Sequence, residues 1–339
     1  DQTGSYSEKQ SCMSAYIIRR ILYTVPIWIG VFLITFALFN MNDPLSIARI
    51  NLPQAPLPAL QAWVRNNNYH IPRYINLPSD ATTIRADGRV HPEFGAESIF
   101  YSQFFHSLRD MFLFRFGLNK NKEPIADAIL QRIPYSLSIT VPGFFLTLIL
   151  STSIALFVAY FRGTATDIGI QFVSVLMMSI ALPVYLLAAN FLFGRIFKLV
   201  PVYNHPLLPI FIFVLYGIGG QIRFFRTVFL DQIDQDYVRT ARAKGLREAH
   251  ILFRHVLPNS LIPILTSVVM ALPFLITGSL LLEQFFGIPG MGDMLYAAIQ
   301  GKDFQVIKVM VYLGSLLYML GSLLTDLSYA AADPRVVLQ

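Results

Sequence analysis

Residues 236–258 read DYVRTARAKGLREAHILFRHVLP, a charged segment that lies between two long apolar runs. Gly245 interrupts the segment near its middle, and Leu257-Pro258 stands at its end. Glycine weakens a helix, and proline restricts the residue before it. The pattern therefore predicts a helix, a break at Gly245 and a second helix that closes on Leu257-Pro258. Together they would form a knob outside the bilayer, suited to docking into another protein.

Seven basic residues sit in this one connector between the two apolar runs, whereas charges in a membrane protein usually scatter over loop tips. The set is Arg223, Arg226, Arg239, Arg242, Lys244, Arg247 and Arg254. We expect Arg239, Arg242 and Arg247 either to pair with acidic residues of a partner or to form a solvated basic face.

The composition indicates an integral membrane protein, because 55% of the residues are apolar and only 14% are charged. Six segments have the uncharged length that a membrane-spanning helix needs. They are residues 17–40, 133–161, 167–194, 201–222, 259–282 and 309–326. The expected fold class is an all-α integral membrane protein with six transmembrane helices.

The distribution of Lys and Arg predicts the orientation of these helices. Six spans place both termini on one side, together with Arg19, Arg20, Arg162, Arg335 and the seven basic residues named above. The other side carries Arg195, Lys198, Lys302 and Lys308. By the positive-inside rule, the first set and both termini are cytoplasmic. The net charge of +6 is then a topology signal, and no aromatic and basic groove motif supports binding to nucleic acid.

The chain divides into four parts on this view. Residues 1–12 form a polar leader or tag, residues 13–42 the first transmembrane helix, residues 43–130 an extracytoplasmic loop, and residues 131–335 a core of five helices with a cytoplasmic loop at 231–258. The single Cys12 lies in the leader, so an internal disulfide and a cysteine-based metal site are ruled out.

The long loop contains one stretch with a clear pattern. Between Phe100 and Phe116, apolar residues recur at helical spacing with polar residues between them. This predicts an amphipathic helix that either lies at the membrane interface or packs against the membrane domain. A loop of this length is usually functional or disordered, and long loops cross the membrane largely regardless of their charge.

Motifs for catalysis or nucleotide binding are missing from the sequence. The dipeptide Gly301-Lys302 is followed by Asp303, so it does not complete a phosphate-binding loop. There is no His/Asp/Glu cluster at metal-ligand spacing and no nucleophile elbow. His250 and His255 are better read as packing or capping residues. We expect no catalytic residue, no metal site and no cofactor in this chain.

The central segment resembles the cytoplasmic coupling loop of ABC importer permeases, whose pattern is Glu-Ala-Ala, three residues, Gly, a spacer and Ile-x-Leu-Pro. Arg239-Thr240-Ala241, Gly245 and His255-Val256-Leu257-Pro258 stand at these places, although the first two positions depart from the general pattern. The string that begins at Tyr237 resembles the oligopeptide, dipeptide and nickel branch. The resemblance assigns contact with the ATPase to Tyr237, Arg239, Thr240, Ala241, Arg242, Lys244, Gly245, His255, Leu257 and Pro258. The small residues Ala241 and Gly245 would allow close approach of the two backbones.

A second string, GSLLLEQFFGIPGMG at residues 278–292, resembles another signature of the same family. It implies an outer gate or turn made by Glu283, Pro289, Gly290 and Gly292. Two roles are open for Glu283, because a carboxylate at the end of an apolar run needs a partner. It could cap and brace the turn, or it could line the outer gate. Further resemblance at Asp303-Phe304 and Asp333-Pro334-Arg335 extends the match over nearly the whole chain, of the first-permease type.

The resemblance implies the type I permease architecture and a place in the cytoplasmic (inner) membrane of a prokaryote. The chain would be the membrane-spanning subunit of an ATP-driven, binding-protein-dependent importer that moves peptides by alternating access. The implied partners are a second homologous permease subunit, two ATP-binding subunits, an extracytoplasmic substrate-binding protein and the lipid membrane. ATP and magnesium would lie on the partner subunits.

The sequence leaves two alternatives to a peptide importer open. One is a permease of the same family for nickel or a metal chelate, for which no Met/His-rich path argues. The other is a secondary transporter that does not use ATP. It would need ionisable residues near the bilayer midplane, and none of the six spans has one at its centre.

Overall fold

The computed structural model describes residues 2–41, 44–52, 54–66, 69, 71–74, 102–196 and 205–332. Every regular element in these ranges is a helix, and Leu118 and Pro124 form an isolated β-bridge. The all-α fold class is therefore confirmed. The chain separates into two compact units. The first comprises Asp1–Ile21, Arg132–Met294 and Leu317–Gln339, and the second comprises Leu22–Gln131 and Leu295–Leu316.

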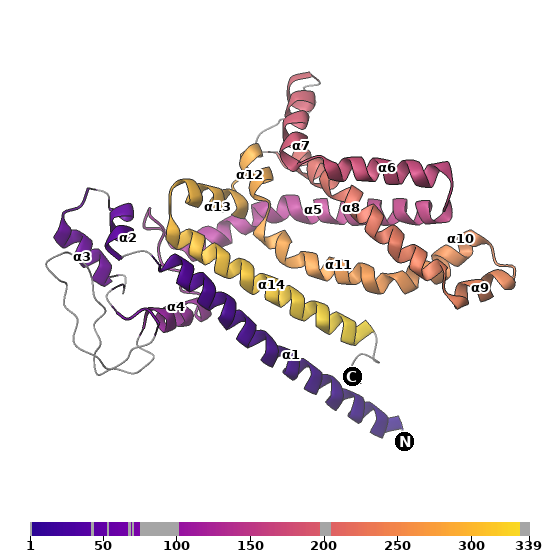
Figure 1. Ribbon diagram of the computed structural model, residues 1–339, viewed down its shortest axis with the longest axis horizontal. Helices are drawn as coiled ribbons and strands as arrows, with labels where there is room; N and C mark the ends of the chain where they lie inside the picture. Colours follow the sequence, from indigo (N-terminus) through magenta and orange to yellow (C-terminus); the bar gives the residue numbers. More distant parts are fainter. Residues whose placement is uncertain are drawn as a thin grey trace. The chain divides into compact units, whose positions relative to one another are not determined.

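The first unit is built on helices that run lengthwise beside one another, α5, α6, α8 and α11 (Figure 1). Its complete elements are α6 (Ala165–Ser179), α7 (Leu182–Ala189), the π-helix η1 (Asn190–Ile196), α8 (Leu207–Ile233), α9 (Asp236–Ala243), α10 (Glu248–Ile251), the π-helix η2 (Leu252–Val256), α11 (Leu257–Thr277) and α12 (Leu280–Phe286). It also contains most of α5 (Ile125–Tyr160), the start of α13 (Met291–Gln300) and the end of α14 (Phe304–Ala332).

The membrane-spanning segments agree with the six expected ones. Five helices are long and apolar enough to cross a membrane: Leu22–Phe39, Ile125–Tyr160, Leu207–Ile233, Glu248–Thr277 and Phe304–Asp326. The sixth expected span, 167–194, is broken, because α6 and the following helix meet at 93°. Ile180 and Ala181 are extended at this bend, directly before the first turn of α7 with its Pro183. A proline cannot continue the hydrogen bonding of a preceding helix.

Two spans end at other residues than the sequence predicts. The fourth helix, α8, runs beyond the uncharged stretch 201–222 to Ile233, so Arg223 and Arg226 lie on that helix and not in a connector. The fifth, α11, stops at Thr277 where Gly278 takes a positive φ of 71°. A helix can continue past its apolar stretch because its backbone hydrogen bonds do not depend on side-chain polarity.

The second unit contains the C-terminal half of α1 (Gln2–Phe39) and the helices that follow it: α2 (Pro44–Asn51), α3 (Leu57–Asn66) and α4 (Gln103–Phe112). Leu45 and Ala48 of α2 pack on Leu60 and Val64 of α3 in a small buried cluster. The described part of the long loop therefore contains packed helices, while residues 43, 53, 67, 68, 70 and 75–101 lie outside the described ranges. The backbone of residues 2–12, interpreted above as a leader or tag, continues α1.

The amphipathic helix expected between Phe100 and Phe116 is α4. Its N-cap Ser102 accepts a hydrogen bond from the Phe105 N–H, which fixes the start of the helix. Phe104 and Met111 are buried, and the Phe104 ring lies 5.5 Å from the rings of both Phe32 and Phe36 on α1. The apolar face of α4 thus packs against a membrane-spanning helix.

Candidate functional site

The break in the central segment (residues 236–258) is a tight helix end with a defined geometry. The Gly245 N–H donates to the Arg242 carbonyl at 2.9 Å, and the Leu246 N–H donates to the Ala241 carbonyl at 3.3 Å. Gly245 itself has a φ of +73°. This pair of bonds with a left-handed residue is the Schellman motif, for which glycine is the preferred residue. A Cβ on Gly245 would meet nothing within 4 Å, so the glycine is needed for its φ and not for space.

Buried residues on both sides of Gly245 anchor the central segment to the rest of its unit. Val238 and Ala241 of α9 lie in one cluster with Ile251, Leu252 and Val256. The cluster also includes residues of α5, α8 and α11: Ala155, Leu156, Ala159, Phe225, Phe229, Ile233 and Ile264. The small side chain of Ala241 therefore serves packing within the chain, whereas Gly245 is exposed.

The outer surface of the central segment is charged and partly paired with itself. Arg242 donates to both carboxylate oxygens of Glu248, Nε to Oε1 at 2.6 Å and Nη2 to Oε2 at 3.3 Å. Arg239 pairs with Asp236 at 3.2 Å. The Arg242–Glu248 bonds clamp α9 to the start of α10 across the Gly245 turn, whereas the Arg239–Asp236 pair lies within α9. Other positions expected to contact a partner, Thr240 and Lys244, are exposed, and Tyr237 is half-buried with its hydroxyl donating to Gln232 at 2.9 Å.

The sequence predicts that the second helix of the central segment ends at Leu257-Pro258, and this prediction is wrong. Helix continues from Glu248 to Thr277 through α10, η2 and α11. Proline lacks the N–H of an α-helical ladder, and the turn just before it is a π-helix with a different bonding pattern. His255 lies on this stretch with its ring 6.2 Å from that of His250, and its carbonyl accepts from Asn259. Leu257 is half-buried and Pro258 is exposed.

The glycine-rich turn (residues 278–293) is organised by the buried carboxylate of Glu283. Its Oε2 accepts from the N–H groups of Gly292 and Asp293, at 2.7 and 3.2 Å, and its Oε1 accepts from the Ser279 N–H at 3.2 Å. Gly292 and Asp293 belong to the first turn of α13, whose N–H groups have no partner inside the helix. Glu283 therefore caps α13, and a place along an outer gate stays a prediction.

Burial raises the pKa of Glu283, and its hydrogen bonds with Ser136 and the three backbone N–H groups act in the opposite direction. Desolvation disfavours the carboxylate, while donors that point at it stabilise its charge. Because the N–H groups are supplied by the backbone of the turn, the fold itself holds the acceptor in place.

Two glycines make room for Glu283, and a third makes room for the backbone at the start of α12. A Cβ on Gly278 or Gly290 would collide with the Glu283 carboxylate and with the Ser136 hydroxyl. A Cβ on Gly292 would lie 2.5 Å from the backbone nitrogen of Leu280. Pro289 is exposed, and the Gly290 N–H donates back to the Ile288 carbonyl at 2.8 Å, so the chain reverses around the proline. The Pro-Gly-x-Gly string thus has a steric origin.

A polar stripe on α5 bonds to the glycine-rich turn and to the end of α11, and the sequence pattern did not predict it. Ser136 Oγ accepts from the Met291 N–H at 2.8 Å, and Arg132 donates to Asp293 at 3.0 Å. Thr140 donates to the Leu275 carbonyl at 2.7 Å. The three residues follow one another at four-residue spacing, which places them on one helix face. That spacing was readable in the sequence, but its partners were not.

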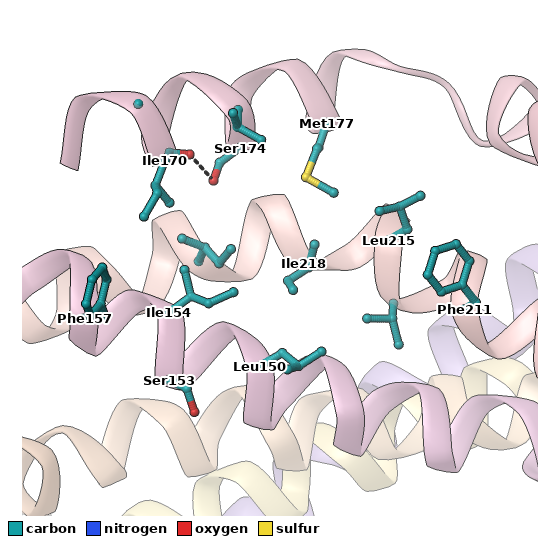
Figure 2. Close-up of a pocket in the computed structure, with 14 residues that line it drawn as sticks. Leu150, Ser153, Ile154, Phe157, Ile170, Ser174, Met177, Phe211, Leu215 and Ile218 are labelled. Carbon is teal, nitrogen blue, oxygen red and sulfur yellow. Dashed lines mark hydrogen bonds between the residues drawn. The ribbon is translucent and has the colours of Figure 1, made fainter. Parts of the chain in front are cut away.

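An apolar pocket of about 760 Å³ lies between α5, α6 and α8 (Figure 2). Its two hydroxyls are satisfied within their own helices, since Ser153 donates to the Ile149 carbonyl and Ser174 to the Ile170 carbonyl. The lining therefore offers no free donor to a polar ligand. Among the described residues there is also no group of His, Cys, Asp or Glu side chains that could hold a metal ion.

A comparison with protein families gives one match that covers more than half of the chain. The family is described as "Binding-protein-dependent transport system inner membrane component", and its model matches residues 151–338. This range includes both the central segment and the glycine-rich turn.

Curated proteins are similar along nearly the whole chain. The oligopeptide transport system permease protein AppB of Bacillus subtilis is 28% identical, over 96% of this chain and 99% of that protein. A putative peptide transport system permease protein of Brucella suis is 29% identical over the same shares of both chains. The glutathione transport system permease protein GsiC of Escherichia coli K12 is 28% identical, again over 96% and 99%.

Proposed function

Because this chain belongs to the family of binding-protein-dependent transport system inner membrane components, we propose that it forms part of the membrane path of an ATP-driven importer of peptides. The substrate class is supported by the similar proteins, which are named for transport of oligopeptides, peptides and glutathione. We expect short peptides to be handed over by an extracytoplasmic binding protein. A second homologous permease subunit would complete the path.

The central segment is the proposed docking site for an ATP-binding subunit. The observation that supports this is the Schellman turn at Gly245, which exposes a charged helix end on a rigid base. A partner that pushes on α9 acts on Val238 and Ala241, and these side chains pack in one cluster with Phe225, Phe229 and Val256. Close packing transmits displacement instead of absorbing it. Movement of the segment would therefore be passed to α8 and α11.

ATP and magnesium would be bound by the partner subunits. Their closure would bias a two-state arrangement of the spans, as alternating access requires. The glycine-rich turn would stay rigid during this change, since Glu283, Ser136 and Arg132 hold it with hydrogen bonds on several sides. In this proposal the central segment and both termini face the cytoplasm, following the excess of Lys and Arg on that side.

Photo-crosslinking in the intact complex tests the docking site. A photoreactive amino acid replaces Ala249, which is exposed at the start of α10, and in a matched variant it replaces Asn121, which is exposed in the turn before α5. We expect the Ala249 variant alone to give an adduct that mass spectrometry identifies as an ATP-binding subunit. An adduct with that subunit from Asn121, or none from Ala249, would contradict the proposed docking site and orientation.

Uptake assays test the substrate separately. Membrane vesicles that contain the complete complex and its binding protein should accumulate a labelled short peptide when ATP is supplied inside. The alternative in the same family, a permease for nickel or a metal chelate, predicts accumulation of radioactive nickel instead. Transport of nickel without transport of any peptide would overturn the substrate assignment while leaving the docking site intact.

A further inference from the structure

The helix α4 runs antiparallel along α1 within the second unit. Near its start, Phe104 contacts Phe36, and at its end, the Phe112 ring lies 4.7 Å from the ring of Trp28. Phe36 and Trp28 are eight residues apart on α1, which corresponds to about 12 Å along a helix axis. Both lie within the apolar span Leu22–Phe39. The chain therefore descends beside the span from near its end towards its middle.

The deepest part of this descent is an apolar tip made by Phe112, Leu113 and Phe114. These residues are 60%, 50% and 60% exposed, so contacts with the described residues leave half or more of each uncovered. Phe114 has a φ of 54°, in the left-handed region that bulky residues rarely adopt. The tip thus turns the chain back sharply and presents three large apolar side chains outward.

Two arginines flank the tip. The contacts of Lys120 show where the aqueous end of the same unit lies. Arg109 and Arg115 are exposed on either side of the tip. Further along, the Lys120 N–H donates to Asp303, and Lys120 Nζ donates to the Gly301 carbonyl, where α14 begins. Tyr312, two turns into α14, stacks on Phe32 at 4.5 Å. The turn at Lys120 therefore lies at the span ends, and the tip lies deeper.

We propose that Phe112, Leu113 and Phe114 insert into the lipid leaflet on the side where α1 ends, which is the outer leaflet in the orientation proposed above. At this depth the aromatic and aliphatic side chains of the tip contact the acyl chains of the lipids. Arg109 and Arg115 can extend their charged ends to the phosphates of the headgroups, as long basic side chains do at membrane interfaces. The segment 103–116 is then a membrane-anchored finger that fixes the long loop relative to the bilayer.

Lipid is favoured over the binding protein as the occupant because of depth and composition. A soluble partner approaches from the aqueous end, where the exposed Asn121 and Lys122 lie. To reach Phe112 it would have to enter beside Trp28, which is inside the apolar span. The exposed Asp110 lies next to Arg109, so the flanks of the tip carry two positive charges and one negative charge, and this net positive charge matches the phosphates of a headgroup layer over acyl chains.

Fluorescence quenching in vesicles tests this placement. The complex is purified with Cys12 replaced by serine, and single cysteines replace Leu113, Phe114 or, as the matched aqueous control, Asn121. Each is labelled with an environment-sensitive dye and reconstituted with phosphatidylcholine that carries bromine on its acyl chains. Bromine should quench the dye at positions 113 and 114 at least about threefold more than at 121, because only the tip reaches the acyl region. Iodide in the external solution should show the reverse order.

Equal bromine quenching at all three positions, or stronger iodide quenching at 113 and 114 than at 121, would overturn the proposal. If the dye at 113 and 114 is accessible to iodide and becomes protected when the purified binding protein is added, the tip is a protein-docking surface instead. Bromine quenching measures how deep the dye lies in the bilayer, not which leaflet it lies in. The experiment therefore tests insertion of the tip even if the chain has the opposite orientation in the membrane.

Discussion

Arg226 on α8 donates two hydrogen bonds to Asp167 on α6, from Nε to Oδ1 at 2.9 Å and from Nη2 to Oδ2 at 2.8 Å. The Asp167 carboxylate also accepts from the Gly163 N–H and the Gln171 side chain. The pair is almost completely buried, with side chains 17% and 4% exposed. One of the basic residues next to the central segment therefore joins two helices and is not available to a partner.

Replacing Asp167 with asparagine should destabilise the protein strongly. Removing one partner of a buried ion pair leaves the other charge without compensation, which typically costs about 3–5 kcal/mol. The matched control is Asp234→Asn, since Asp234 pairs with Arg162 on the surface and both side chains are more than half exposed. That change should cost about 0–1 kcal/mol. Thermal unfolding of both variants in the same detergent measures the difference, and equal losses would contradict the structural role of Asp167.

Replacing Gly292 with alanine should also destabilise, for a steric reason. The added Cβ would lie 2.5 Å from the Leu280 backbone nitrogen, and backbone cannot move aside as a flexible side chain can. We expect a loss of about 1–3 kcal/mol, as for other overpacked sites. Gly314→Ala on α14 is the control, because its Cβ would meet nothing within 4 Å and alanine favours a helix by up to about 1 kcal/mol. Opposite signs of the two shifts in unfolding temperature are the expected result.

Replacing Glu283 with glutamine should weaken the glycine-rich turn. Both carboxylate oxygens accept N–H groups, so the amide nitrogen of glutamine would face a donor and leave it unsatisfied. Such a loss costs about 1–3 kcal/mol. Glu248→Gln removes a carboxylate that is about half exposed and should cost about 0–1 kcal/mol. Thermal unfolding of the two variants in the same detergent measures the difference in stability. If Glu283→Gln were as stable as the unchanged protein, Glu283 would not hold the turn.

Replacing Gly245 with leucine should uncouple ATP hydrolysis from transport. The variant introduces a side chain on the proposed docking surface and strains a left-handed residue by about 1 kcal/mol. Gly163→Leu is matched in both respects, since Gly163 has a φ of 79° and open surroundings, but it lies outside the central segment. We expect reduced uptake per ATP hydrolysed for Gly245→Leu alone. An identical defect in both variants would attribute the effect to backbone strain.

Composition and residue spacing were enough to predict the fold class and the number of spans. Long uncharged runs gave the number of spans, because every backbone polar group in a bilayer must be bonded within its own segment or its protein. The glycines at 245, 290 and 292 were recognisable because no other residue fits a left-handed turn or such close contacts so readily. The prediction that the whole charged central segment lies between two spans is only half right, because its second half, from Glu248 on, belongs to the candidate span Glu248–Thr277.

The contacts between polar side chains could not be predicted in this way and are visible only in the folded chain. The sequence pattern predicts Arg226 to be one more residue of a basic connector, and the partner that buries it, Asp167, lies 59 residues away. The same holds for Ser136 and Glu283, which converge on the first turn of α13 from α5 and α12. Periodicity reports whether a face of a helix is buried, because burial depends on average polarity. Pairing depends on distances between segments, and a one-dimensional pattern does not contain them.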